Sequence, residues 1–409
     1  MNTEQTEDGD FIITVESTED DTFCRVCGRK ICKFHGCDEW ICLRHLSILG
    51  HQVYIRLRPK RYKCNCSHKP TTTQRLEWYE SRSPHTKEYD KHLMLQLVNS
   101  TIEDVSRKED VGYDAVAGAL KRCIQTSIDW TQFDELKVLG IDEVALKKGH
   151  KEYAAIISTQ QADGYVSVLT VLPGRKKKMV RDFLDTIPKR LRPTMETVCT
   201  DMWDGYVNAA EEFAAAHDDV SIAVVIDRFH VATSSRCSYG KNYRDCVDKV
   251  RKSECRRLKN ELSEEEYEEI KGVKWATRKN NRDLTTRERQ KLRRLFIHSP
   301  NLKLAYTFRE ELTAIFEMIL SREEAVERLK VWKAKVERSS LKCFNSFLKT
   351  LTNWLDKIAN YFVARLSSGF VEGLNTKIKT LMRRCYGIRR VGHIFQRLYL
   401  DIQGYRRFA

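Results

Sequence analysis

Apolar and polar positions follow two different periods along this chain, and the changes of period divide it into regions. Between residues 135 and 234, short runs rich in β-branched residues alternate with stretches of helical spacing, which predicts an α/β domain. Residues 86–130 and 235–366 show helical spacing alone, the second with many Lys, Glu and Arg residues. Three tryptophans are expected to anchor the core of this second helical region: Trp275, Trp332 and Trp354.

Five strands are predicted within the α/β region, with one helix before the fourth strand and another before the fifth. The strands are expected at 136–142, 153–158, 165–171, 197–201 and 222–227. Three strands, a helix, a strand, a helix and a strand is the order of a ribonuclease-H-like fold. The first and fourth strands are neighbours in such a sheet, so Asp142 and Asp201, which end them, are expected to lie side by side.

Two aspartates at neighbouring strand ends suggest a metal site, although an aspartate at a single strand end is usually a turn or cap residue. Like charges at close range cost free energy unless a cation neutralises them. Carboxylate oxygens in small numbers suit Mg²⁺ or Mn²⁺, which can bridge the phosphate oxygens of a substrate. Glu143 follows Asp142 directly, and consecutive strand residues face opposite sides, so only one of the two can point at such metals.

A third carboxylate is available in the run SGFVEGLNTKIK, which is predicted to form a helix from Ser368. Glu372, Asn375 and Lys379 are spaced to share one face of that helix. A carboxylate, an amide and an ammonium group on one face suit a metal beside a phosphate backbone. The alternative is a solvated surface helix, and the spacing alone favours that alternative.

The charge of the chain favours a polyanionic partner. The formal net charge is +15, although residues 1–21 hold eight acidic residues and no Lys or Arg, and are expected to form a disordered acidic tail. Residues 22–409 then carry 72 basic and 49 acidic side chains, a net charge of +23. Nucleic acid is the usual partner of such a surface, with a solvated basic face as the alternative.

The apolar residues give no sign of a membrane protein. No run of about 18 apolar residues occurs, so a membrane-spanning helix is excluded. The first residues, MNTEQTEDGD, lack the basic and apolar parts of a signal peptide. We therefore expect a cytoplasmic protein with no membrane partner.

Seven of the 14 cysteines fall between Cys24 and Cys66, which indicates metal binding in a reducing cytosol. Cys24-x-x-Cys27 and Cys64-x-Cys66 form two thiolate pairs, and four thiolates match a structural zinc site. Free cysteines in a core are the alternative. His68 could replace one sulfur, and a second zinc site remains open from a further set of residues: Cys32, His35, Cys37, Cys42 and His45.

A helix-turn-helix is predicted between the cysteine-rich segment and the α/β region. Ser100-Thr-Ile-Glu103 has the capping-box form that begins a helix, and Gly112 marks the turn before a second helix at 113–124. Val116, Leu120 and Cys123 are expected to face inward, whereas Lys121 and Arg122 are expected to be exposed and to contact phosphates. Any helical pair can imitate this pattern.

Five longer runs occur in order along the chain: GIDEVALKKGHKEY, LPGRKK, TDMWDGY, VIDRFHV and GFVEGLNTKIKTLMRRCYG. With these motifs, the sequence from about Cys24 to its end resembles the bacterial insertion-sequence transposases of the ISL-three family. The resemblance implies a ribonuclease-H-like catalytic domain in which Asp142, Asp201 and Glu372 are the DDE triad. The separation of 171 residues between Asp201 and Glu372 implies a large helical insertion.

The same resemblance implies further site residues. The Asp227-Arg-Phe-His230 run fits a pair found near the active site of DDE enzymes with such insertions, where it either supports the site or contacts DNA. The family has a zinc ribbon at the cysteine-rich segment, usually with a wider second pair than Cys64-x-Cys66. Independently of the resemblance, four basic residues are DNA-contact candidates because they lie in basic runs close to the expected metals, although a solvated face is the default for such runs: Arg175, Lys176, Arg383 and Arg384.

The expected architecture is multidomain α+β. It comprises the acidic tail (1–21), a zinc ribbon (22–70), a helix-turn-helix (86–130), a catalytic domain (135–234 and 367–409) and a helical insertion (235–366). The expected function is metal-dependent cleavage of DNA at terminal inverted repeats followed by strand transfer into target DNA. This function needs Mg²⁺ or Mn²⁺ in the catalytic site, structural Zn²⁺, and a homodimer or larger synaptic complex on the nucleoid. Two alternatives are a non-catalytic DNA-binding regulator derived from a transposase and a nuclease of the same fold without strand transfer.

Overall fold

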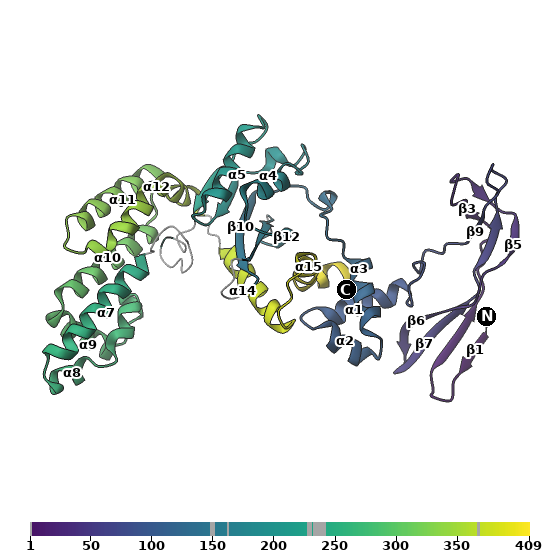
Figure 1. The fold of residues 1–409 in the computed structure, drawn as a ribbon, viewed down its shortest axis with the longest axis horizontal. Coiled ribbons are helices and arrows are strands. Elements are labelled where there is room, and N and C mark those ends of the chain that lie inside the picture. Colours follow the sequence, from purple (N-terminus) through teal and green to yellow (C-terminus); the bar gives the residue numbers. More distant parts are fainter. Residues whose placement is uncertain (1, 148–151, 162, 227–230, 232–242, 366–368) are drawn as a thin grey trace. The chain divides into compact units, whose positions relative to one another are not determined.

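The computed structural model describes residues 2–147, 152–161, 163–226, 231, 243–365 and 369–409 (Figure 1). The chain divides into two compact units, one made of Met1–Ile128 with Ile378–Ala409 and the other of Asp129–Lys377. The sequence predicts that all of 367–409 belongs with the catalytic domain, whereas most of this segment groups with the N-terminal modules. The reason is the packing of helix α15 (Val391–Phe408) against helix α1 (Lys87–Leu97).

The first unit opens with a four-stranded sheet in the order β1-β2-β7-β6. These strands are β1 (Asn2–Gln5), β2 (Phe11–Val15), β7 (His51–Leu57) and β6 (Ile41–Ile48). The prediction of a disordered tail at 1–21 is therefore wrong. Strand β2 has the β-branched sequence FIITV and pairs in parallel with β7. Some of the acidic residues around it have basic partners, with ion pairs of 2.9 Å from Glu4 to Arg56 and 2.8 Å from Asp20 to Lys60.

The cysteine-rich segment forms two small sheets. One pairs β3 (Thr22–Phe23) with β4 (Lys30–Ile31), and the other has the order β5-β8-β9, with β5 at Phe34–Cys37, β8 at Lys60–Lys63 and β9 at Thr71–Thr73. The hairpin β6–β7 lies between β5 and β8 in sequence but belongs to the four-stranded sheet. The segment therefore contributes to two structures rather than to one ribbon.

Three helices follow the strands of the first unit: α1, α2 (Ile102–Glu109) and α3 (Tyr113–Cys123). Thr101, one residue later than predicted, caps α2, and its Oγ1 accepts the backbone N–H of Asp104 at 3.0 Å. Val116 and Leu120 are buried as predicted, and Leu400 of α15 packs into the same core. Helix α15 is thus a fourth helix of the predicted helix-turn-helix region.

A five-stranded sheet forms the core of the second unit, in the order β12-β11-β10-β13-β14. The strands are β10 (Val138–Ala145), β11 (Tyr153–Gln160), β12 (Val166–Leu172), β13 (Thr197–Thr200) and β14 (Ala223–Ile226). The first three pair antiparallel, and β13 and β14 run parallel to β10. The predicted neighbourhood of the first and fourth strands is confirmed. Helices α4 (Lys177–Leu184) and α5 (Asp204–Ala215) pack against each other beside this sheet.

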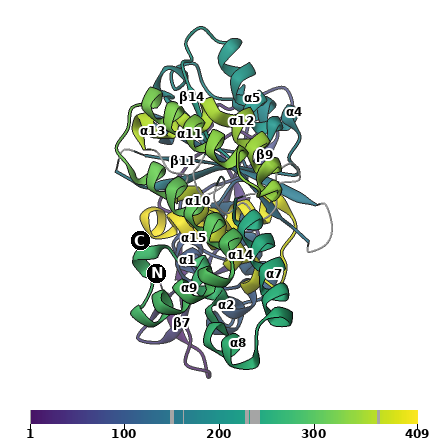
Figure 2. The same cartoon turned by 90° about the vertical axis from the view of Figure 1, so that its left-hand side faces the viewer.

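Helices make up most of residues 243–365, which lie between β14 and α14 (Gly369–Arg384). They are α7 (Tyr243–Glu261), α8 (Glu264–Ile270), α9 (Thr286–His298), α10 (Pro300–Glu317), α11 (Arg322–Glu337), α12 (Asn345–Ala359) and α13 (Tyr361–Ala364). Helices α10, α11 and α12 lie side by side (Figure 2). Trp332 is a core anchor as predicted, but Trp275 is 54% exposed. Within the described part of the chain, no helix has the length and apolar character needed to cross a bilayer.

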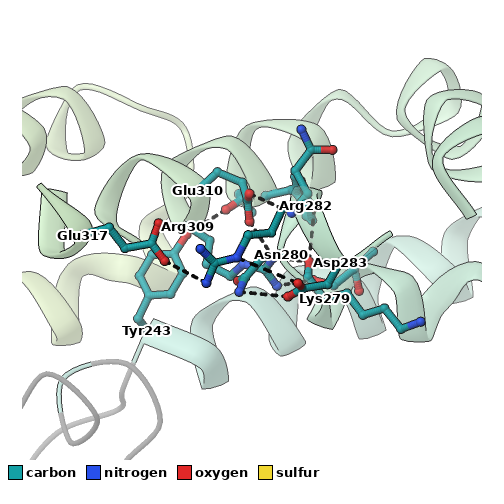
Figure 3. Close-up of polar contacts among 12 residues, drawn as sticks. Tyr243, Lys279, Asn280, Arg282, Asp283, Arg309, Glu310 and Glu317 are labelled. Atoms are coloured by element: carbon teal, nitrogen blue, oxygen red, sulfur yellow. Dashed lines mark hydrogen bonds and ion pairs between the residues drawn. The ribbon is translucent and has the colours of Figure 1, made fainter. Parts of the chain in front are cut away.

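The connection between α8 and α9 is held in place by Arg309 of α10 (Figure 3). Its Nη1 donates to the carbonyl oxygen of Thr277 at 2.6 Å, and its Nη2 donates to Glu310 at 2.7 Å and to the carbonyl oxygen of Lys279. A charged donor with backbone acceptors makes strong hydrogen bonds. Arg309 therefore helps to fix the backbone of this connection, which contains only short 3₁₀ turns, through hydrogen bonds to two of its carbonyl oxygens.

Candidate active site and metal centres

Asp142 and Asp201 lie next to each other because β10 and β13 are parallel neighbours. The last residue pair of their ladder is Ile141 with Thr200, and each aspartate is the next residue of its chain segment. Asp142 is 8% exposed and Asp201 is 7% exposed. The sequence predicts that the first strand ends at Asp142, but β10 continues to Ala145 because its antiparallel pairing with β11 extends beyond its pairing with β13.

Helix α14 reaches this pair of carboxylates through Asn375. The Asn375 side-chain amide donates a hydrogen bond to Oδ2 of Asp142, while the backbone N–H of Glu143 donates to Oδ1 at 2.6 Å. The close approach of α14 to β10 depends on Gly140, since a Cβ there would lie 2.9 Å from two ring carbons of Phe370 and closer still to Val371. Asn375, which the sequence predicts to support the active site, therefore contacts Asp142.

The two aspartates form an electrostatically unfavourable pair in the absence of a cation. Burial raises the pKa of Asp201 well above its ordinary value, and the nearby carboxylates of Asp142 and Glu143 raise it further. Oδ1 of Asp201 is buried and has no hydrogen-bond partner among the described residues. A divalent cation would satisfy this oxygen and relieve the repulsion, so the residues present fit Mg²⁺ or Mn²⁺.

Glu143 and Asp142 have different partners. The Glu143 carboxylate contacts Nη1 of Arg175 at 3.2 and 3.3 Å. Burial raises the pKa of Glu143, although the charge of Arg175 opposes this effect. The Arg175 guanidinium also lies 4.4 Å from the ring centroid of Tyr153 and 4.3 Å from that of Trp203. Arg175, which the sequence predicts to contact DNA, therefore makes three contacts within the protein.

Several predicted residues are placed only in part. Lys176 is exposed at the beginning of α4, where its side chain is open to solvent. Lys379 is exposed on α14, in the part of that helix grouped with the first unit. Asp227, His230 and the side chain of Glu372 lie outside the described residues. The position of Glu372 is within α14, three residues before Asn375.

The predicted zinc residues do come together. The sulfur atoms of Cys24, Cys27, Cys64 and Cys66 all lie within 4.8 Å of one another, and Cys27 Sγ is 3.6 Å from Cys64 Sγ. Four sulfurs bound about 2.3 Å from one zinc ion would be about 3.8 Å apart. The described residues contain no further cluster of three or more potential metal ligands, so the second zinc site and the alternative ligand His68 have no support.

The thiols of this cluster do not ionise equally. The backbone N–H groups of Cys27 and Val26 lower the pKa of Cys24 to about 6. The N–H of Cys66 also lowers the pKa of Cys64, but burial and the neighbouring thiols outweigh it and raise this pKa to about 12. Four thiolates at this spacing need a cation to balance them, which fits a structural Zn²⁺.

The basic residues predicted to bind DNA from the first unit fall into two groups. Lys121 on α3 and Arg383 on α14 are exposed. Arg122 instead donates to the buried carboxylate of Asp90 from Nε at 2.9 Å and from Nη2 at 2.8 Å. Arg384 likewise makes an ion pair with Asp401 of α15. Arg122 and Arg384 are therefore paired with buried acids inside the fold, and the local sequence does not reveal these pairs.

Comparison with known proteins identifies the family. A family profile described as "Transposase", built on DDE transposases of the ISL-three insertion sequences, matches residues 139–398. The chain belongs to this family. The transposase of insertion sequence element IS1001 from Bordetella parapertussis is 25% identical over 384 residues, which cover 94% of this chain and 89% of the relative. The transposase of element IS1557 from Mycobacterium tuberculosis is 23% identical over 398 residues, which cover 94% and 86%.

Among solved structures, the Drosophila P element transposase strand transfer complex is similar at 11% identity and a TM-score of 0.45. The similarity covers 79% of this chain and 93% of that one. For the ISL-three transposase described here, the family match spans β10 to α15 and so includes Asp142, Asp201 and Asn375. Arg175 and the residues that it contacts, Tyr153, Trp203 and Glu143, also lie within the family match. The sequence placed Arg175 and Trp203 in the LPGRKK and TDMWDGY motifs but did not indicate that they are in contact.

Proposed function

We propose that this transposase cleaves DNA at the ends of its insertion sequence and joins the released ends to target DNA, with Asp142, Asp201 and Glu372 as the catalytic triad. The observation that supports this proposal is the adjacent burial of Asp142 and Asp201, with one oxygen of Asp201 unpartnered among the described residues. Glu372 is the third member by its place on α14, the helix that brings Asn375 to Asp142.

The carboxylates of the triad would hold Mg²⁺ or Mn²⁺, which supplies positive charge that stabilises a phosphodiester as it is attacked. In the first step water attacks the phosphodiester and frees a 3′-hydroxyl group. In the second step that hydroxyl attacks a phosphodiester of target DNA at the same site, and the bond from that phosphorus to the 3′-oxygen of the target strand breaks. Asn375 keeps one oxygen of Asp142 in a fixed direction in both steps, since its amide donates to Oδ2 and leaves Asp142 little freedom to rotate. The Asp227 and His230 pair belongs to this site by resemblance alone.

The first unit is the module that we assign to recognition of terminal inverted repeats. Its four-cysteine cluster would hold a structural Zn²⁺, and α2 and α3 would be the DNA-reading pair, with Lys121 and Arg383 as exposed phosphate contacts. Two element ends must be held together for transposition, so we infer a dimer or larger synaptic complex on the nucleoid. The curated relatives are transposases of insertion sequence elements, which supports the same class of DNA substrate here.

The test is an assay in vitro with flanking element ends, Mg²⁺ and a target plasmid. Asp142→Asn, Asp201→Asn and Glu372→Gln keep side-chain shape but remove a charge, and each should abolish both cleavage and joining. Double variants should be hardly worse than single ones, as expected for residues that act as a unit. Asp204→Asn, at the exposed first residue of α5, is the matched control and should retain activity. Joining by Glu372→Gln at near the wild-type rate would show that Glu372 is not the third carboxylate.

A further inference from the structure

The Arg175 side chain, which lies close to the carboxylates of the candidate active site, is enclosed by two aromatic rings and by Glu143. Aromatic rings from two different segments lie on it: Tyr153 begins β11, and Trp203 precedes α5. Its Nη1 contacts Glu143 of β10, so that the side chain connects three segments of the catalytic unit. The Arg175 side chain is only 25% exposed. Stacking on rings and pairing with a carboxylate are both interactions that the planar guanidinium makes better than an ammonium group.

Trp203 is fastened to Arg175 at two points. Its ring lies 4.3 Å from the guanidinium carbon, and its Nε1 donates to the carbonyl oxygen of Arg175 at 3.4 Å. Gly205 makes room for the indole, because a Cβ there would lie 3.1 Å from Cδ1 of Trp203 and closer still to Nε1. The indole is therefore held against Arg175 by both its face and its edge.

This attachment is important because Asp201 is not on a strand. Strand β13 ends at Thr200, and the residues from Asp201 to Trp203 form no regular secondary structure before α5 begins at Asp204. The backbone of such a segment is not fixed by hydrogen bonds to a neighbouring strand. The orientation of the Asp201 side chain therefore depends on the contacts that the rest of the segment makes. Met202 of this segment is buried in the hydrophobic core, and Trp203, two residues after Asp201, holds the segment on its other side through its contacts with Arg175.

We propose that Arg175 is a positioning residue for the divalent-cation site, which fixes the segment carrying Asp201 through Trp203, and that Glu143 is its counterion and not a cation ligand. This inference rests on the proposed function, because it assumes that Asp142 and Asp201 hold the cation. It assigns the two adjacent acids of β10 to separate tasks. Asp142 faces Asn375 and the cation, whereas Glu143 holds the arginine that orders the second aspartate.

The competing role for Arg175 is direct contact with a DNA phosphate. Its enclosure disfavours this role, because the two rings and Glu143 already contact the guanidinium. The two roles predict different measurements. A phosphate contact affects DNA affinity and leaves cation affinity unchanged, whereas a positioning residue changes cation affinity in the absence of DNA.

The experiment measures Mn²⁺ binding to the zinc-loaded full-length protein without DNA, by electron paramagnetic resonance. Arg175→Gln should raise the dissociation constant for Mn²⁺ by about 10-fold or more, the usual range for residues that orient metal ligands. Arg175→Lys should recover only part of this loss, since lysine keeps the charge but cannot stack flat between the rings. Glu143→Gln retains an oxygen acceptor for Arg175 and should stay within a few-fold of wild type.

A matched control is available on α4. Arg181 also lies over an aromatic ring, at 5.6 Å from that of Phe213, and pairs with Asp185, but it contacts neither aspartate of the site. Arg181→Gln should leave Mn²⁺ binding unchanged. Labelling with 5-fluorotryptophan gives a second readout, because the Trp203 signal, assigned with Trp203→Phe, should move in Arg175→Lys and stay in place in Arg181→Gln.

The possible outcomes separate this inference from the proposed function. Asp142→Asn and Asp201→Asn that bind Mn²⁺ like wild type would overturn both. If those variants lose Mn²⁺ while both Arg175 variants bind it within twofold of wild type, the proposed function stands and the positioning role is wrong. Loss of DNA affinity alone in the Arg175 variants would assign Arg175 to a phosphate contact. Loss of Mn²⁺ binding in Glu143→Gln equal to that in Asp142→Asn would make Glu143 a ligand.

Discussion

Replacement of Gly140 tests whether the contact between α14 and β10 sets the geometry of the candidate active site. In Gly140→Ala, the new Cβ would lie 2.9 Å from two ring carbons of Phe370 and closer still to Val371. Carbon atoms in contact prefer about 3.5–4.0 Å, so α14 would have to move by roughly 1 Å. Overpacking of this kind costs about 1–3 kcal/mol, which the lower chain entropy of alanine offsets by about 0.5–1 kcal/mol.

The variant should therefore lose up to about 2.5 kcal/mol of unfolding free energy, measured by urea denaturation. Its cleavage rate should fall by up to about 100-fold, because a displacement of about 1 Å in a catalytic group is enough for such a loss. Gly373→Ala on the same helix is the control: nothing lies within 4 Å of a Cβ there, so it should stabilise the helix by about 0.5–1 kcal/mol. A Gly140→Ala protein as stable and active as wild type would refute the reasoning.

Further predictions concern the first unit. Cys24→Ser should lower the zinc content measured by atomic absorption, and a chelator-free wild-type preparation without zinc would contradict the site. Lys121→Ala should reduce the slope of DNA affinity against salt by about one phosphate contact without changing stability, and an unchanged slope would exclude that contact. Arg122→Ala should instead lower the unfolding free energy, because it leaves the buried carboxylate of Asp90 without its arginine partner. The loss should be near the lower end of about 3–5 kcal/mol, because Arg122 is itself 26% exposed. Burial raises the pKa of Asp90, but hydrogen bonds from His85 and Arg122 outweigh it and lower the pKa below 3.8. The ionised form therefore contributes stability above pH 3.8 that is lost as the pH falls through the folded-state pKa, and Asp90→Asn should flatten this acid dependence in thermal melts.

The sequence was most informative where local patterns decide the structure. Runs rich in β-branched residues predicted all five strands of the sheet in the second unit, and the two runs that lead to Asp142 and Asp201 predicted that these acids are adjacent. The paired cysteines predicted the cluster of Cys24, Cys27, Cys64 and Cys66. In each case the signal is a short segment whose own residues determine its role, either through period or through ligand spacing.

Contacts between distant segments were beyond such patterns. The acidic residues at 1–21 suggested disorder, because the basic partners of Glu4 and Asp20 lie about 40–50 positions away. The sequence did not indicate that Arg122 and Arg175 pair with Asp90 and Glu143 within the fold, because a basic residue near a helix end gives no sign of an acidic partner from a distant segment. Trp275 was expected in the core, but the short turn that carries it leaves the ring exposed. These outcomes depend on the tertiary fold.

The grouping of residues 378–409 with 1–128 has a consequence for synthesis of the protein. About 250 residues separate the two parts, which a ribosome takes about 12–50 s to translate at about 5–20 residues per second. Until α15 emerges, the apolar cluster that α1, α2 and α3 form lacks Leu400, and α1 lacks the helix that packs against it. The first unit therefore cannot finish folding until α15 has been synthesised, and a chain that ends before α15 cannot form the complete unit. If the first unit recognises the element's ends, as proposed, truncated products of the gene are expected to compete poorly for those ends.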